Sequence, residues 1–197
     1  MISSPNQLIV SMLIAKAPRR FGGRLMLSAS DAVWDAVDVL PDSLKEYLTD
    51  DLGNEKPSYG GFLFPKNMTA IDVANSMGYY SAFRGVAQSD VIYTDCTNAM
   101  PVEAIGRGLI FVGWDVVSGN GWVSASCRGV FPINPFDGNC RENGMNDVNP
   151  YGLIDDYEKC TAYAKSNNFI NAGHAPWYPV SIFIDSTTLA RLNSLRG

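Results

Sequence analysis

The chain has 197 residues, of which 46% are hydrophobic and 18% are charged, and it contains 18 glycines and 11 prolines. This composition excludes a collagen, a coiled coil, a disulfide-rich miniprotein and a disordered tail. The formal net charge of −5 at pH 7 argues against general nucleic-acid binding, which requires a basic face for the phosphates. We expect a single domain over residues 1–197, with residues 1–50 and 67–197 as a possible subdivision.

The first third of the chain has patterns that predict helices. Residues 6–16 contain the longest apolar run, Leu8 to Ala15, which Ser11 interrupts and which is much shorter than the roughly 20 residues that span a bilayer. No Lys or Arg precedes this run, unlike in a signal peptide. We therefore expect a buried helix over residues 6–16, a cytoplasmic location and no membrane association. From Asp31 to Leu40, apolar residues recur at spacings of three and four, which predicts a second helix that Pro41 ends. A short third helix is expected after Pro41.

The second half has patterns that predict strands. Residues 109–117 and 121–127 flank the sequence Ser-Gly-Asn-Gly, whose residues tolerate the positive φ of a tight turn. Helices are predicted over residues 69–77 and 155–167, a strand over residues 180–184, and a C-terminal helix that Ser186 or Thr187 caps. We therefore expect an α+β fold with a mainly antiparallel sheet built around the 109–127 hairpin, helices packed on one side, and a helical N-terminal third.

Charge is distributed unevenly along the chain. Residues 1–30 contain no acid and four bases, whereas residues 31–55 contain eight acids and one base. Six of these acids step by three or four residues, as on one face of a helix: Asp31, Asp35, Asp38, Asp42, Glu46 and Asp50. One interpretation is the solvated side of amphipathic helices. The other is a docking surface for a protein partner with a basic surface, where a negative field speeds encounter.

Residues 147–158 resemble the calcium-binding loop of EF-hand proteins. Oxygen ligands occur at positions one, three, nine and twelve, which are Asp147, Asn149, Asp155 and Glu158, the spacing that wraps a cation. Tyr151 replaces the expected ligand at position five. The alternative is a turn followed by a helix with acids at its positive end. We expect no bound metal and no cofactor.

Four cysteines and one histidine limit the possible chemistry. Cys96, Cys127, Cys140 and Cys160 form no Cys-x-x-Cys pair, so a zinc ribbon is not expected. Reduced thiols are the default, and a disulfide between Cys140 and Cys160 is the alternative. A cysteine nucleophile would be Cys96 or Cys127, activated by His174 and oriented by Asp185 or Asn171.

The absence of an evident catalytic set favours binding over catalysis. We expect a small acidic binding protein, rather than an enzyme, that neutralises a basic protein partner through the acidic segment. Bacterial or phage immunity proteins and anti-defence inhibitors have this profile. Direct contact with nucleic acid is not expected. The alternative is a cysteine-dependent hydrolase or transferase that uses Cys96 or Cys127 with His174.

Overall fold

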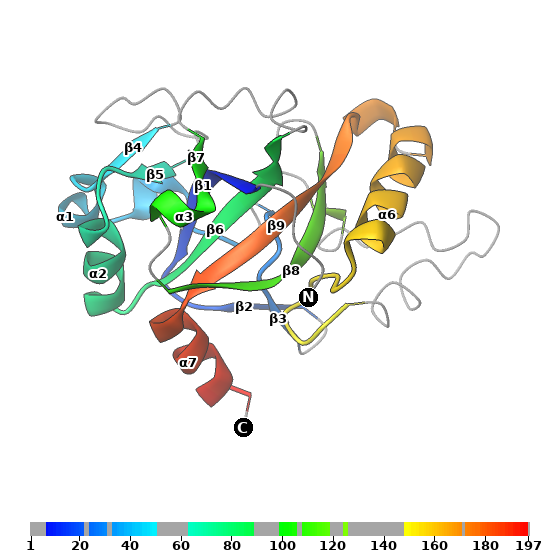
Figure 1. Cartoon of the computed structure of the whole chain (residues 1–197). Helices are drawn as coiled ribbons and strands as arrows, with labels where there is room; N and C mark the ends of the chain where they lie inside the picture. The colour runs from blue at the N-terminus through cyan, green and yellow to red at the C-terminus, as the bar shows by residue number, and fades with distance from the viewer. Residues whose placement is uncertain are drawn as a thin grey trace.

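The computed structural model describes residues 7–21, 24–30, 33–50, 63–88, 99–105, 108–118, 124–125, 148–170 and 172–196. Within them, a seven-stranded sheet has the order β4-β5-β1-β6-β9-β8, and β7 also pairs with β1 (Figure 1). All of its strand pairs are antiparallel. The strands of this sheet are β1 (Gln7–Ala15), β4 (Leu48–Asp50), β5 (Leu63–Pro65), β6 (Tyr80–Ala87), β7 (Met100–Pro101), β8 (Leu109–Ser118) and β9 (Trp177–Asp185).

The remaining elements are a hairpin and short or medium helices. The hairpin consists of β2 (Arg19–Phe21) and β3 (Arg24–Met26), which pair with each other. The helices are the 3₁₀ helices η1 (Val37–Val39) and η3 (Ala172–His174) and the α-helices α1 (Asp42–Lys45), α2 (Thr69–Ser76), α3 (Val102–Ile105), α6 (Tyr157–Ile170) and α7 (Ser186–Ser194). The expected α+β class with a mainly antiparallel sheet is confirmed. No helix in the described ranges is long and apolar enough to cross a membrane.

The expectation of a helical N-terminal third is wrong, because residues 7–15 form strand β1. This strand pairs with β6 over most of its length and with β5 and β7 on its other edge. Most of its side chains are buried, whichever face of the sheet they occupy. A segment that is buried on both faces has a continuous apolar run with no period, and such a run fits a central strand as well as a buried helix.

Residues 33–40 do not form the predicted α-helix either. They contain only the 3₁₀ helix η1; Val37 at its start and Leu40 just after it are buried, while Ala36 just before it is exposed. A spacing of three also places two side chains on one side of a 3₁₀ helix. Just before η1, the backbone N–H of Asp35 donates to the carbonyl of Ile14 at 2.9 Å. This contact holds the chain extended against the end of β1, where an α-helix would have used the same donor internally.

The predicted hairpin is only partly described, and it does not lie at the centre of the sheet. Strand β8 spans the predicted residues, and Ser124 returns to form one antiparallel bridge with Val117; the turn between them and most of the second strand lie outside the described residues. Strand β8 pairs with β9 along its length and ends the strand order. The sheet is therefore built around β1, β6 and β9, not around the hairpin.

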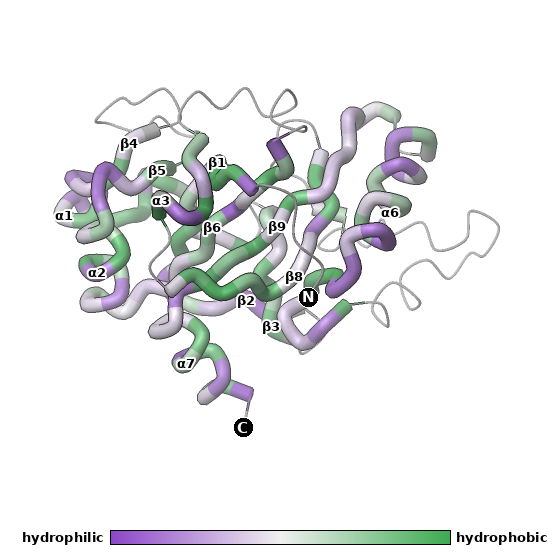
Figure 2. Tube along the Cα trace, viewed as in Figure 1, coloured by the Kyte–Doolittle hydropathy of each residue, from purple (hydrophilic) through white to green (hydrophobic). Residues whose placement is uncertain are grey.

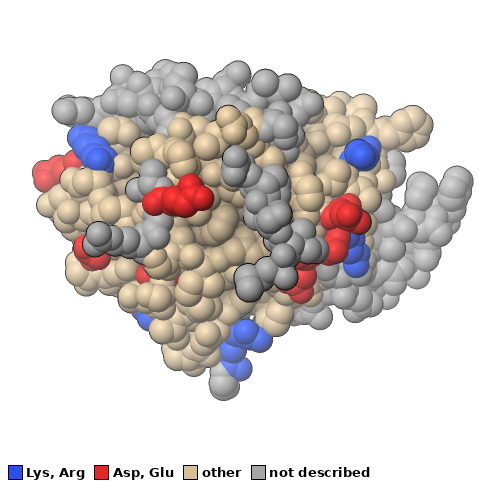
Figure 3. All heavy atoms as spheres, in the orientation of Figure 1, with Lys and Arg blue, Asp and Glu red and all other residues tan. Residues whose placement is uncertain are grey.

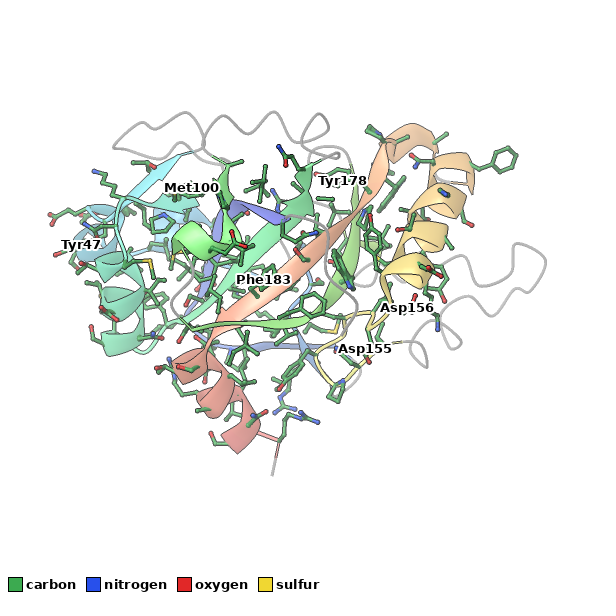
Figure 4. The ribbon with its side chains drawn as sticks, in the orientation of Figure 1. Tyr47, Met100, Asp155, Asp156, Tyr178 and Phe183 are labelled. Carbon is green, nitrogen blue, oxygen red and sulfur yellow. The ribbon has the colours of Figure 1, made fainter. Side chains whose placement is uncertain are left out.

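The two faces of the sheet have different covers. Directly paired residues share a face, and so do alternate residues of one strand. Phe83 pairs with Phe183, and Trp114 pairs with Ser181, two residues before Phe183. The three aromatic side chains therefore lie on one side. Helices α1, α2 and α3 pack on one end of that face and α6 on the other, and Phe183 lies between them in Figure 4.

The opposite face, with Ile182 at its centre, is covered mainly by residues 25–34 and by Leu192 of α7. Figure 2 shows the apolar strands between these more polar covers.

A buried carboxylate fixes residues 25–34 on the sheet. The side chain of Asp115 is 1% exposed. Its Oδ2 accepts from the backbone N–H of Ala29 at 2.8 Å, and its Oδ1 accepts from the N–H of Val116 and the hydroxyl of Ser124, each at 2.8 Å. A buried charge is tolerated only where hydrogen bonds replace its hydration, so Asp115 requires these segments to meet.

Replacing Asp115 with Asn should therefore lower the free energy of unfolding by about 2–3 kcal/mol. The amide would present N–H₂ to one of the donors that now faces a carboxylate oxygen, which leaves a buried donor unsatisfied. Urea denaturation measures the change. Asp72→Asn is the control, because Asp72 is exposed on α2 and its replacement should change stability by less than about 0.5 kcal/mol.

Candidate functional site

The six acids of the predicted docking surface have different environments. Asp35 is held inside the structure: its side chain is 12% exposed, its carboxylate accepts from the backbone N–H of Lys16 at 2.6 Å, and it pairs with Arg19 at 3.2 Å. It connects the chain before η1 to the end of β1. The side chains of Asp31 and Asp50 lie outside the described set. The remaining three acids therefore decide what this segment presents to solvent.

These three acids, with Val39, form what we call the acidic surface: Asp38, Val39, Asp42 and Glu46. All four are exposed, and Figure 3 shows acidic atoms over α1 at the left of the molecule. Lys45 is the neighbouring base; its Nζ lies 3.3 Å from a carboxylate oxygen of Asp42, whose side chain is 97% exposed. The acids do not share one helical face, because η1, Pro41 and the one-turn helix α1 divide the segment.

The EF-hand-like segment is folded as a turn. The side-chain oxygen of Asn149 accepts from the N–H groups of Tyr151 and Leu153, and its amide nitrogen donates to the carbonyl of Val112 and to a carboxylate oxygen of Asp155. Both polar atoms of Asn149 are thus used within the fold. Asp147 lies outside the described residues.

The acids after this turn stand at the beginning of α6. The carboxylate of Asp156 accepts from the N–H of Lys159 at 2.7 Å, the bond of a helix N-terminal cap. Asp155 and Glu158 are exposed nearby, where negative charge favours the positive end of the helix dipole. Among the described residues, no three His, Cys, Asp or Glu side chains are grouped as a metal site. This segment has the arrangement of the turn-and-helix alternative.

The residues of the cysteine-nucleophile alternative are not brought together where they are described. His174 is exposed in η3, before β9 begins, and Asp185 is the last residue of β9. Eight strand steps of about 3.3 Å separate Trp177 from Asp185, roughly 26 Å. Asp185 therefore does not orient the imidazole of His174. Cys96, Cys127 and Asn171 lie outside the described residues.

Asp185 is instead the N-terminal cap of the C-terminal helix α7. The sequence pattern assigned this cap to Ser186 or Thr187. The carboxylate of Asp185 accepts from the N–H groups of Thr187 and Thr188 and from the side chains of Ser81 and Asn75. Burial by itself would raise the pKa of Asp185, but these hydrogen bonds, with Thr188 first among the donors, outweigh burial and lower the pKa. The ionised carboxylate thus links α7 to α2 and β6.

Cys160 is a free thiol inside α6 with none of its surface exposed. Its Sγ lies 3.4 Å from the carbonyl oxygen of Asp115. Burial raises the pKa of Cys160, and the charges of Asp115 and Asp156 raise it further. A thiol that stays protonated is a poor nucleophile, so Cys160 packs as a small apolar side chain. Cys140, the partner considered for a disulfide with Cys160, lies outside the described residues.

The structure also joins two basic segments that the sequence separates. Arg20 donates to the carbonyl of Leu195 at 2.9 Å, which places the β2–β3 hairpin beside the end of α7. The sequence has no acid in residues 1–30 or in residues 186–197. This shared absence of acids is the sequence feature that could have indicated a common basic surface. The proximity of the two segments depends on the tertiary fold.

Comparisons with known proteins provide no further assignment: no protein-family model, no curated protein and no solved structure matches this chain.

Replacing Asp35 with Asn should lower the free energy of unfolding by about 1–2 kcal/mol, because hydrogen bonds to a charged acceptor are lost. Asp38→Asn, three residues away and exposed, should change it by less than about 0.5 kcal/mol. Urea titrations of the two variants and the parent protein test the difference. Equal stability of the two variants would contradict a structural role for Asp35.

Replacing Asp185 with Ala should destabilise the protein by about 2 kcal/mol at neutral pH, because a cap and two side-chain bonds are removed. The pKa of Asp185 is lowered in the folded protein, so the advantage of the parent over the variant is present above the pKa of the unfolded chain. It should diminish as the pH falls through the lower, folded-state pKa. Urea unfolding at a series of acidic pH values measures this; a difference that stays constant with pH would contradict the assignment.

Proposed function

We propose that this chain is a non-catalytic binding protein that neutralises a protein partner with a basic surface, in the manner of immunity proteins and anti-defence inhibitors, and that the acidic surface makes the contact. The observation that carries the proposal is the exposure of three carboxylates around an exposed Val39. Such a combination fits recognition of a protein surface.

The electrostatics support this assignment. The carboxylates of Asp38 and Glu46 have no cation within 4.0 Å in the described part of the chain. The nearby Lys45 pairs with the carboxylate of Asp42 and donates to the backbone carbonyl of Asp38 at 3.4 Å. Three acids and one base leave this surface with a net negative charge. Exposed charges of one sign attract an oppositely charged partner before contact and raise the association rate, more strongly than they raise affinity.

The apolar component supports it as well. Val39 is 64% exposed, although the nearby Val37 and Leu40 are buried. Protein interfaces commonly place apolar side chains at the centre and polar groups at the rim. Val39, surrounded in sequence by Asp38 and Asp42, supplies such a centre. A single exposed valine is common on any surface, so the proposal depends on its combination with the charges.

The first step of the test identifies the partner. The purified protein is cross-linked in a lysate of its source, and captured proteins are identified by mass spectrometry. The partner is then purified and its binding to the protein is measured directly. Loss of the partner's own activity on binding distinguishes neutralisation from simple association.

The second step tests the acidic surface. The double variant Asp38→Lys/Glu46→Lys should slow association with the partner by about tenfold or more at low salt, with a smaller effect at high salt. Its melting temperature should stay close to that of the parent, because neither carboxylate has an ion-pair partner in the described part of the fold. Stopped-flow kinetics measures the rate.

The matched control is Glu103→Lys/Glu158→Lys, which changes the net charge equally at exposed positions on α3 and α6. It should slow association much less. Equal slowing by the two double variants would mean that only net charge matters. A partner whose binding is insensitive to salt and to the Asp38 and Glu46 changes would overturn the proposed contact.

A further inference from the structure

Five cations from two ends of the chain lie around α7 and the turn that follows α2, and we call them the basic surface: Lys16, Arg19, Arg20, Arg191 and Arg196. Arg20 reaches the carbonyl of Leu195, next to Arg196. Lys16 donates to the carbonyl of Met77 at 3.1 Å, and Arg191 donates to that of Tyr79 at 2.7 Å. The turn at residues 77–79 therefore holds both of these cations.

Part of this surface has a structural role. The turn at residues 77–79 follows α2, and cations near a helix C-terminus satisfy its last carbonyls and its dipole. Lys16 and Arg191 fill that role. It does not extend to Arg20 or Arg196, which contact the end of α7 and the ring of Tyr151 instead. The surface therefore has more positive charge than the capping of α2 uses.

Three of the five cations are held by uncharged groups. Arg19 pairs with the carboxylate of Asp35. Lys16, Arg191 and Arg196 are held instead by neutral carbonyls and by the rings of Tyr79, Tyr80 and Tyr151, at 4.8, 4.1 and 5.3 Å from the ring centroids. These contacts orient the cations without neutralising them.

Orientation before contact favours binding of an anion. Ordering a free Lys or Arg side chain on association costs about 0.5–1.5 kcal/mol, and contacts that already restrict the chain reduce this cost. Guanidinium groups also present several donors that match carboxylate oxygens two at a time. Leu195, 43% exposed between the arginines, adds an apolar contact. In Figure 3, basic atoms lie beside the C-terminal end of α7.

The neighbouring acidic surface limits the size of the anion. Asp35 pairs with Arg19, and Asp38 follows three residues later, within about 11 Å along an extended chain. A long polyanion that crossed the basic surface would run onto Asp38 and be repelled, whereas a short acidic segment fits on the basic surface alone. We propose that the basic surface binds a short acidic peptide segment of a protein partner, at a site distinct from the acidic surface.

The probe is a fluorescently labelled oligoglutamate peptide, whose binding to the full chain is followed by anisotropy. Binding should weaken as salt is added, because exposed charges are screened. The double variant Arg20→Glu/Arg196→Glu should weaken it by about tenfold or more. The control Lys159→Glu/Lys165→Glu makes the same change in net charge on α6 and should leave binding near the parent level.

A second pair of variants separates charge from folding. Arg20→Gln/Arg196→Gln removes the charge and keeps hydrogen-bond donors, and it should retain the parent's circular dichroism and melting temperature while it weakens binding. Three results would each overturn the proposal: no binding of the peptide, equal weakening by the α6 control, or tighter binding of an oligothymidylate of equal charge, which would indicate a nucleic-acid ligand. None of these results bears on binding through the acidic surface.

Discussion

The carboxylate of Asp115 is the contact on which the arrangement of the chain around the sheet depends. It lies in an edge strand and is almost completely buried, and it is hydrogen bonded to the nearby Ser124 and to Ala29, which is 86 residues away in the sequence. An ionised group without such donors in this place would cost several kcal/mol. The sheet can therefore bury Asp115 only when residues 25–34 lie across it. The same residues then cover the apolar face around Ile182.

The outer edge of β8 is protected by a second set of contacts. The backbone of Ile154 exchanges two hydrogen bonds with Trp114, and Asn149 bonds the carbonyl of Val112. This close approach requires Gly113, which has φ of 145°; a Cβ there would lie 2.6 Å from the Cβ of Leu153. An exposed strand edge invites pairing with other chains, so the turn that resembles a cation-binding loop in sequence serves as an edge cover.

The fold also separates the charges of the chain. The acids at residues 38–46 and the bases beside α7 occupy different surfaces, and Arg19 of the basic surface pairs with Asp35. The net charge of −5 is a sum over the whole chain and does not show this separation. Both proposed contacts depend on it, because a long-range field arises where charges of one sign are grouped.

The sequence by itself determined the α+β class, the helices near residues 69–76 and 157–170, and strands β8 and β9, because each has a local pattern of apolar residues or turn residues. It also identified Asp38 and Glu46 as acids of one segment. Only the tertiary structure decided that residues 7–15 are a strand, since a run buried on both faces has no period. It likewise decided that Asp35 is structural while Asp38 is exposed, and that Arg20 lies beside Arg196. Burial and pairing between distant residues depend on how the sheet assembles, and local sequence patterns do not encode them.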